Sequence, residues 1–269
     1  MNNNLTNTVT LYSQSHFLIE IEKLVQYLER AKPDEQYYQT MLCSLPRCFS
    51  VYSPMYKYSE HIQLLWDACA AVGILGQFPV PLTMDVVVAL VSWIAQAVKQ
   101  PYLKRFKSDR RYEMNSKNNH LSQYAQSLHQ HYARLLVIRV DLYYRMESQC
   151  YVRIDDVYRH LEMMTIAKYG NPLFEHLVGS AWCLEQGETR GYHLHTVYYF
   201  KGSEHRNDWY MAKLIGELWQ RLTNDLGTYH SCNTPKEKKK YEKLETLGVG
   251  MIHRKDDVAC ENAINAVGY

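Results

Sequence analysis

The sequence lacks the cysteine pattern of a disulfide-bonded or zinc-binding protein. Its seven cysteines are odd in number, and no two of them are spaced as C-x-x-C, which argues against both a disulfide framework and a structural zinc site. A signal peptide is missing as well, because Met1-Asn2-Asn3-Asn4 has neither the basic start nor the apolar stretch of one. We therefore expect a protein of a reducing compartment, the cytoplasm.

Long apolar runs and a strong net charge are also absent. The most apolar stretch, residues 84–98, contains Asp85 and ends at Lys99, so it is too short to span a bilayer and is expected to form a buried helix. The formal net charge is only +2, so any contact with nucleic acid has to come from local patches. Apolar residues make up 46% and charged residues 22% of the 269 residues, which is typical of a globular protein with one large or two modest domains.

Hydrophobic periodicity predicts a mostly helical N-terminal region, residues 1–132. Apolar residues recur at steps of three and four from Phe17 to Leu28, and Lys32-Pro33 ends that helix. Two further helices, a polar loop and a short helix are predicted at residues 60–72, 84–98, 115–120 and 121–132.

From residue 133 onward, strand patterns alternate with helix patterns. Residues 134–144 alternate between two faces as a strand does. A helix, a two-stranded hairpin, a second helix, a charged loop, a short strand and a last helix follow, at residues 154–169, 176–200, 207–222, 236–240, 248–254 and from 256. The order βαββαβα predicts an α+β domain over 133–269, with an antiparallel sheet of ferredoxin-like or RNA-recognition-like type that carries helices on one face and leaves the other open.

The sharpest local signal is the pair His193 and His195. Residues two apart on a strand point to the same face, so the two imidazoles are neighbours that can hold one divalent ion, while Leu194 points into the core. The preceding strand offers a third ligand, Glu185, and the turn between the strands offers a weaker one, Glu188. An isolated H-x-H pair also occurs by chance on exposed strands, but the hairpin, the acidic neighbour and the order of elements favour a metal site.

The H-L-H strand, the E-Q-G sequence before it and the upstream I-R-V-D-L-Y strand resemble the HUH endonuclease superfamily. Within it, residues 133–269, about half of the chain, resemble the replication-initiator-like proteins of filamentous phages and prophages that are grouped with the YagK/YfjJ C-terminal domain. The resemblance implies that His193, His195 and a third polar side chain bind Mg²⁺ or Mn²⁺. It also implies that a tyrosine on a later helix attacks a phosphodiester of DNA.

The same resemblance places the nucleophilic tyrosine on the helix after the last strand, commonly as Tyr-x-x-Lys. Tyr269 is the matching residue, although no lysine follows it in this sequence. Two interpretations stay open: a truncated chain or element, or an ordinary terminal tyrosine. Less favoured substitutes for the nucleophile are Tyr143, Tyr144 and Tyr199.

Basic side chains in two places are candidates for contacts with the DNA backbone. Arg139 shares a sheet face with the proposed metal ligands and either contacts a phosphate or forms an ion pair with Asp141. The stretch 99–112 interleaves basic and aromatic residues, which indicates either DNA contact or a solvated linker. Its residues expected at the DNA are Lys104, Arg105, Arg110 and Arg111. The lysine-rich residues 236–243 are expected to form a solvated loop.

The function implied by the resemblance is metal-dependent nicking of DNA to start rolling-circle replication, with a 5′-phosphotyrosyl link to the cut strand. The expected partners are single-stranded DNA or an unwound duplex origin, possible host replication proteins, and no membrane. Two alternatives are a non-catalytic DNA-binding relative of these initiators and an RNA-binding module. The second depends on aromatic rings presented by the central strands, for which Tyr143 and Tyr199 are the candidates.

Overall fold

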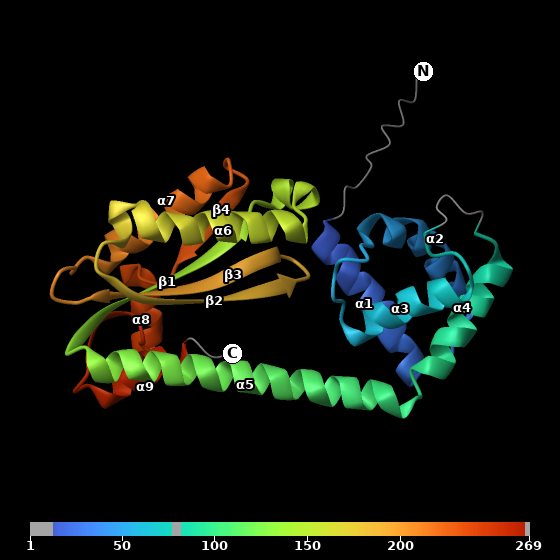
Figure 1. Cartoon of the computed structure of the whole chain (residues 1–269), viewed down its shortest axis with the longest axis horizontal. Helices are drawn as coiled ribbons and strands as arrows, with labels where there is room; N and C mark the ends of the chain where they lie inside the picture. The colour runs from blue at the N-terminus through green and yellow to red at the C-terminus, as the bar shows by residue number, and fades with distance from the viewer. Residues whose placement is uncertain (1–12, 77–81, 267–269) are drawn as a thin grey trace, which may run out of the picture. The chain divides into compact units, whose positions relative to one another are not determined.

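The computed structural model describes residues 13–76 and 82–266, and the chain divides into two compact units (Figure 1). The first unit comprises residues 1–99 and 147–153, and the second comprises residues 100–146 and 154–269. Nine α-helices, two 3-10 helices and one five-stranded antiparallel sheet occur among the described residues, which confirms the α+β class.

The first unit consists mainly of four helices packed around an apolar core. Their bounds are α1 Gln14–Arg30, α2 Glu35–Val51, α3 Glu60–Ala71 and α4 Met84–Ala97, and the 3-10 helix η1 covers Met146–Tyr151. The side chains of Ser13, Asp34 and Thr83 cap α1, α2 and α4 by accepting a backbone N–H bond from the first turn. The sequence pattern did not predict α2, since Pro46 lies inside it and proline disfavours helix interiors.

Helix α5 (Pro101–His131) is one continuous helix of 31 residues. It includes residues 115–120, so the loop predicted there was wrong. That polar run has no apolar period because this part of α5 is mostly exposed, and it contains no glycine or proline to end the helix. Ala125 and Leu128, near the C-terminal end of α5, are buried in the core of the second unit. Helix α5 therefore packs with the sheet, whereas the sequence pattern assigned it to the N-terminal region, residues 1–132.

The sheet of the second unit has the strand order β2-β3-β1-β4, and β5 also pairs with β1. Strand β5 pairs with residues 134–137 of β1 and β4 with residues 140–144, so the two short strands occupy successive parts of β1. The strand bounds are β1 Arg134–Tyr144, β2 Leu177–Gly187, β3 Gly191–Lys201, β4 Gly227–Ser231 and β5 Gly250–His253.

One strand and one α-helix of the second unit were not predicted from the sequence. Strand β4 has only five residues, too few for a clear alternation of apolar and polar side chains. Helix α8 (Pro235–Lys243) replaces the predicted charged loop, and the pattern missed it because none of its residues is buried. The observed order is therefore β-α-β-β-α-β-α-β-α, with β4 and α8 added before the predicted last strand and helix.

Helices α6 (Ile154–Gly170) and α7 (Asp208–Leu222) cover one face of the sheet. Tyr144 of β1 lies between them: its hydroxyl is 2.9 Å from Nδ1 of His160 on α6, and its ring contacts Trp219 on α7 at a centroid distance of 5.5 Å. Helix α7 approaches β4 closely, since a Cβ at Gly216 would lie 2.2 Å from the ring of Tyr229. Most of this face is thus covered by the two helices.

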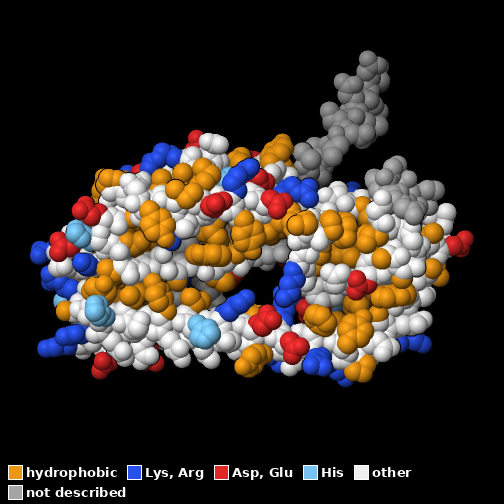
Figure 2. Space-filling view, in the orientation of Figure 1, with side chains coloured by type: hydrophobic (Ala, Val, Ile, Leu, Met, Phe, Trp, Pro, Cys, Tyr) orange, Lys and Arg blue, Asp and Glu red, His pale blue; other side chains and the backbone are white. Residues whose placement is uncertain are grey.

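Hydrophobic side chains remain exposed over α6 and the edge strand β2, where they gather on the side shown in Figure 2. The exposed large residues of these two elements are Tyr158, Met163, Ile166, Tyr169 and Trp182. Trp182 pairs with Thr196 in the sheet, so it lies on the face that α6 and α7 cover.

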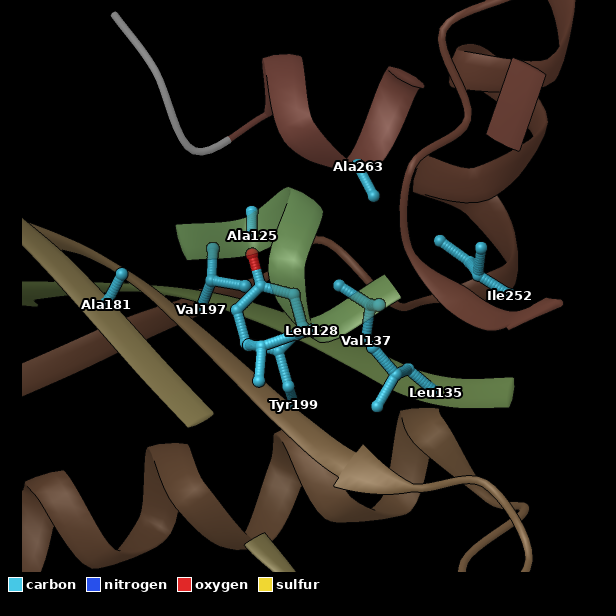
Figure 3. Close-up of a cluster of buried hydrophobic side chains, with 9 residues drawn as sticks. All are labelled: Ala125, Leu128, Leu135, Val137, Ala181, Val197, Tyr199, Ile252 and Ala263. Atoms are coloured by element: carbon cyan, nitrogen blue, oxygen red, sulfur yellow. The ribbon is translucent and has the colours of Figure 1, made fainter. Parts of the chain in front are cut away.

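The opposite face of the sheet is partly covered, in contrast to the open face expected from the sequence. Helices α5 and α9 (Asp257–Asn265) contribute Ala125, Leu128 and Ala263 to a buried cluster with apolar side chains of the strands (Figure 3). The strand residues of this cluster are Leu135, Val137, Ala181, Val197, Tyr199 and Ile252. Farther along β1 and β3 the same face carries polar side chains, and these form the candidate site.

Candidate metal centre

The three predicted ligands come together on adjacent strands β2 and β3. In the pairing of these strands Glu185 lies opposite His193, and Cys183 lies opposite His195. The alternation of β3 places both imidazoles on the face of the sheet opposite Leu194, which is fully buried, as the sequence predicted. The hairpin register is therefore what brings the carboxylate of Glu185 to the two rings.

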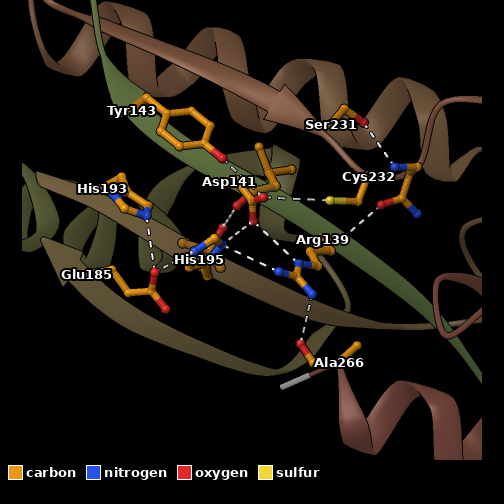
Figure 4. A network of polar contacts seen from close by, with 12 residues as sticks. Arg139, Asp141, Tyr143, Glu185, His193, His195, Ser231, Cys232 and Ala266 are labelled. Carbon is orange, nitrogen blue, oxygen red and sulfur yellow. Dashed lines mark hydrogen bonds and ion pairs between the residues drawn. The ribbon is translucent and has the colours of Figure 1, made fainter. Parts of the chain in front are cut away.

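Three possible ligand atoms converge at this point (Figure 4). Oε2 of Glu185 lies 3.2 Å from Nε2 of His193 and 3.3 Å from Nε2 of His195. The three groups offer ligand atoms that all lie within 4.8 Å of one another, so the cluster is able to hold a metal ion. His193 is buried and the Glu185 side chain is 39% exposed, which leaves the cluster open on the carboxylate side.

The other nitrogen of each imidazole already faces an acceptor. Nδ1 of His193 lies 3.1 Å from the carbonyl oxygen of Gly191, and Nδ1 of His195 lies 2.7 Å from Oδ1 of Asp141. A proton on each Nδ1 satisfies these contacts and leaves both Nε2 lone pairs directed at Glu185, which is the tautomer that a metal ligand needs.

Asp141 on β1 contacts Nδ1 of His195, the ring nitrogen that does not face Glu185. Its carboxylate lies 3.4 Å from Nε of Arg139 and accepts a hydrogen bond of 3.3 Å from the Tyr143 hydroxyl. Burial alone would raise the pKa of Asp141, but the hydrogen bond from His195 and the charge of Arg139 outweigh it and hold the pKa below its usual value. The sequence predicted Asp141 on the same sheet face as Arg139 and the proposed ligands, and gave it a role only in an ion pair with Arg139. Its place opposite His195 follows from the register of β1 and β3, which the sequence does not show.

Arg139 connects the cluster to the end of α9. Its Nη1 donates to the carbonyl oxygen of Ala266 at 3.1 Å, while its Nη2 lies 3.4 Å from Nδ1 of His195. The ion pair with Asp141, one of the two roles expected for Arg139, is present, and the side chain is only 18% exposed. Its contact with DNA stays a prediction.

The candidate tyrosines have different surroundings. Tyr143 stacks on His193 at a centroid distance of 5.4 Å, its hydroxyl accepts a 2.8 Å hydrogen bond from Arg190, and burial raises its pKa to about 12. Tyr144 lies on the opposite face, and Tyr199 is fully buried in the core. Tyr269 lies outside the described residues.

The remaining predicted site residues lie outside β3, the strand that carries the two histidines. Glu188, the weaker ligand candidate, lies in the turn between β2 and β3 and is not one of the three groups of the cluster. The basic residues of the stretch 99–112 lie on the exposed first half of α5, several helical turns before its buried contacts with the sheet. Those residues are Lys104, Arg105, Arg110 and Arg111.

Comparison with protein-family models, curated proteins and solved structures finds no match for this chain. Within the described residues, no single helix combines the length and apolar character needed to cross a bilayer, and only α4 and α5 taken together, as a bent pair, meet that test.

Replacing Asp141 by asparagine is expected to weaken Mn²⁺ binding by about tenfold to a hundredfold, as is typical when a carboxylate that orients a metal-binding histidine is changed. The asparagine keeps the size of the side chain but removes the negative charge that orients the His195 ring through Nδ1. Isothermal titration with Mn²⁺ measures the effect. The exposed Asp109→Asn on α5 serves as the control, and equal affinities of the two variants would contradict the role given to Asp141.

Proposed function

We propose that residues 133–269 form an HUH-type domain with a ferredoxin-like sheet, and that the protein is a DNA-nicking replication initiator of the phage and prophage type. The observation that carries this proposal is the convergence of two imidazole nitrogens and one carboxylate oxygen on the partly uncovered face of the sheet. The central position of β1 and β3, flanked by β2 and β4, is in keeping with such a sheet. The seven free cysteines fit a protein that works in the cytoplasm.

The proposed reaction is a transesterification at a phosphate of single-stranded DNA. The Tyr269 hydroxyl loses its proton and bonds to phosphorus, while the bond from phosphorus to the 3′-oxygen breaks. That oxygen takes up a proton, so the products are a 5′-phosphotyrosyl link and a free 3′-hydroxyl that a polymerase can extend. A Mg²⁺ or Mn²⁺ ion bound to His193, His195 and Glu185 would supply Lewis-acid polarisation of the phosphate, which is worth several kcal/mol.

The contacts around the cluster suit this chemistry. Asp141 and the Gly191 carbonyl keep both imidazoles in the ligand tautomer, so the protein does not have to rearrange them for each turnover. Arg139 pairs with Asp141, the partner of His195, and donates to the carbonyl oxygen of Ala266, three residues before Tyr269 in the sequence.

A denaturing gel tests the proposal directly. The protein is incubated with labelled single-stranded DNA and Mn²⁺, and the wild type is compared with Tyr269→Phe and His193→Ala. We expect a slower-migrating covalent adduct from the wild type alone, because one variant lacks the nucleophile and the other a metal ligand. An adduct that survives Tyr269→Phe would reassign the nucleophile, and a wild type that binds DNA without forming an adduct would favour the non-catalytic alternative.

The RNA-binding alternative has less support in the structure. It requires aromatic rings that the central strands present to unpaired bases. Tyr143 is 9% exposed and stacked on His193, and Tyr199 is fully buried under α5 and α9. Neither ring is available for stacking on a base.

A further inference from the structure

A pocket of about 280 Å³ lies beside the candidate metal centre, in the second unit. Its walls come from β1, α8, the connection from α8 to β5, and α9. The lining side chains combine one guanidinium, one aromatic ring, one hydroxyl and two amides, those of Arg139, Tyr241, Thr246, Asn262 and Asn265. None of the three candidate metal ligands lines this pocket.

The pocket is built by specific contacts between its walls. Nδ2 of Asn262 donates to the carbonyl oxygens of Glu245 and Leu247, at 3.0 and 3.3 Å, and so fastens the loop after α8 to α9. The loop approaches the α9 backbone directly at Gly248, where a Cβ would lie 2.5 Å from the carbonyl carbon of Asn262. Because these contacts define the walls, the pocket is already formed before a ligand enters.

Arg139 belongs to both the pocket and the metal centre. Its guanidinium lines the pocket and at the same time contacts Asp141, His195 and the Ala266 carbonyl (Figure 4). A strand of nucleic acid whose phosphate lies at His193 and His195 would therefore have a neighbouring base next to this pocket. Because Arg139 belongs to both, the pocket and the metal centre form one continuous surface.

The chemistry of the pocket matches an unpaired nucleobase. A tyrosine ring can stack on the face of any base, and the amide of Asn265 offers one donor and one acceptor side by side, which pairs with the edge of a base. The N–H groups of Asn262 already bond to the loop, so that amide offers only its oxygen. Phosphate alone would not need an amide and an aromatic ring. We infer that this pocket binds one base of the DNA strand held at the metal centre and makes nicking depend on the base at that position. This inference rests on the proposed function, because it takes the strand at the metal centre to be DNA.

The experiment maps base contacts by binding, independently of cleavage. A single-stranded oligonucleotide is replaced at each position in turn by an abasic nucleotide, and affinities with Mn²⁺ are measured by fluorescence anisotropy using Tyr269→Phe, so that no covalent product contributes. We expect one position at which loss of the base weakens binding by roughly tenfold, the effect of losing one stacked base.

The pocket is then identified by a double-mutant comparison. Asn265 is exposed on α9, so Asn265→Ala is expected to fold normally, to weaken binding of the intact oligonucleotide, and to lose nothing more when the base at the sensitive position is removed. Tyr241→Ala is expected to behave in the same way, and Gln123→Ala, an exposed amide on α5, is the matched control and should keep the full abasic penalty.

The outcomes of these experiments separate the two proposals. A covalent adduct without any sensitive position, or an abasic penalty unchanged in Asn265→Ala and Tyr241→Ala, would overturn the base pocket and leave the nuclease proposal intact. A sensitive position that depends on Asn265, without an adduct from the wild type, would overturn the nuclease proposal and keep the pocket. Failure to bind any oligonucleotide would overturn both.

Discussion

Replacing His195 by alanine is expected to reduce Mn²⁺ affinity by roughly a hundredfold or more, beyond the effect of changing a residue that only supports a ligand. The substitution removes one of three ligand atoms and also the partner of Asp141, whose carboxylate would be left buried beside Arg139. The loss should appear in isothermal titration calorimetry with Mn²⁺, and the proposed DNA nicking should fall with it. His193→Ala is expected to have the same direction of effect on both measurements.

The matched control for this prediction is His120→Ala. His120 is exposed on α5, so its removal should leave both Mn²⁺ affinity and stability close to those of the wild type. If His195→Ala binds Mn²⁺ as tightly as His120→Ala does, the cluster of Glu185, His193 and His195 is not the metal site. Circular dichroism of each variant shows whether the fold is kept.

Replacing Trp219 by alanine should cost about 3–5 kcal/mol of unfolding free energy, the usual range for a buried tryptophan. Trp219 is fully buried on α7, packs against Tyr144 and His160, and donates from Nε1 to the carbonyl oxygen of Tyr143 at 2.9 Å. The substitution therefore leaves a cavity and a buried carbonyl without its donor. Urea unfolding followed by circular dichroism measures the change.

The control for the buried tryptophan lies on the same helix. Trp209 is 45% exposed in the first turn of α7, and Trp209→Ala is expected to change the free energy of unfolding by less than about 1 kcal/mol. A loss of similar size in both variants would mean that α7 does not anchor the sheet through Trp219. Because the carbonyl bonded by Trp219 belongs to Tyr143, which stacks on His193, Trp219→Ala is also expected to weaken Mn²⁺ binding.

Local patterns were sufficient for several helices and strands. The apolar steps of α1, α3 and α4 and the alternation of β1 and β2 predicted these elements close to their observed positions. The patterns failed where burial leaves no period: α8 has no buried residue, the first half of α5 is mostly exposed, and β4 is short. The exposed helical segments are held by local backbone hydrogen bonds that leave no apolar period, whereas β4 depends on its pairing with β1, which is distant in sequence.

The sequence by itself determined that His193 and His195 share one face of a strand, because side-chain direction alternates with every residue, and it placed Glu185 on the neighbouring strand of a hairpin. Only the tertiary structure decided that Asp141 supports His195, that Arg139 joins the cluster to Ala266, and that a pocket opens beside them. Those contacts depend on the register between β1 and β3 and on the docking of α8 and α9, where residues up to 127 positions apart meet. Such distances lie beyond any local periodicity, so the physical basis of the site is set by packing.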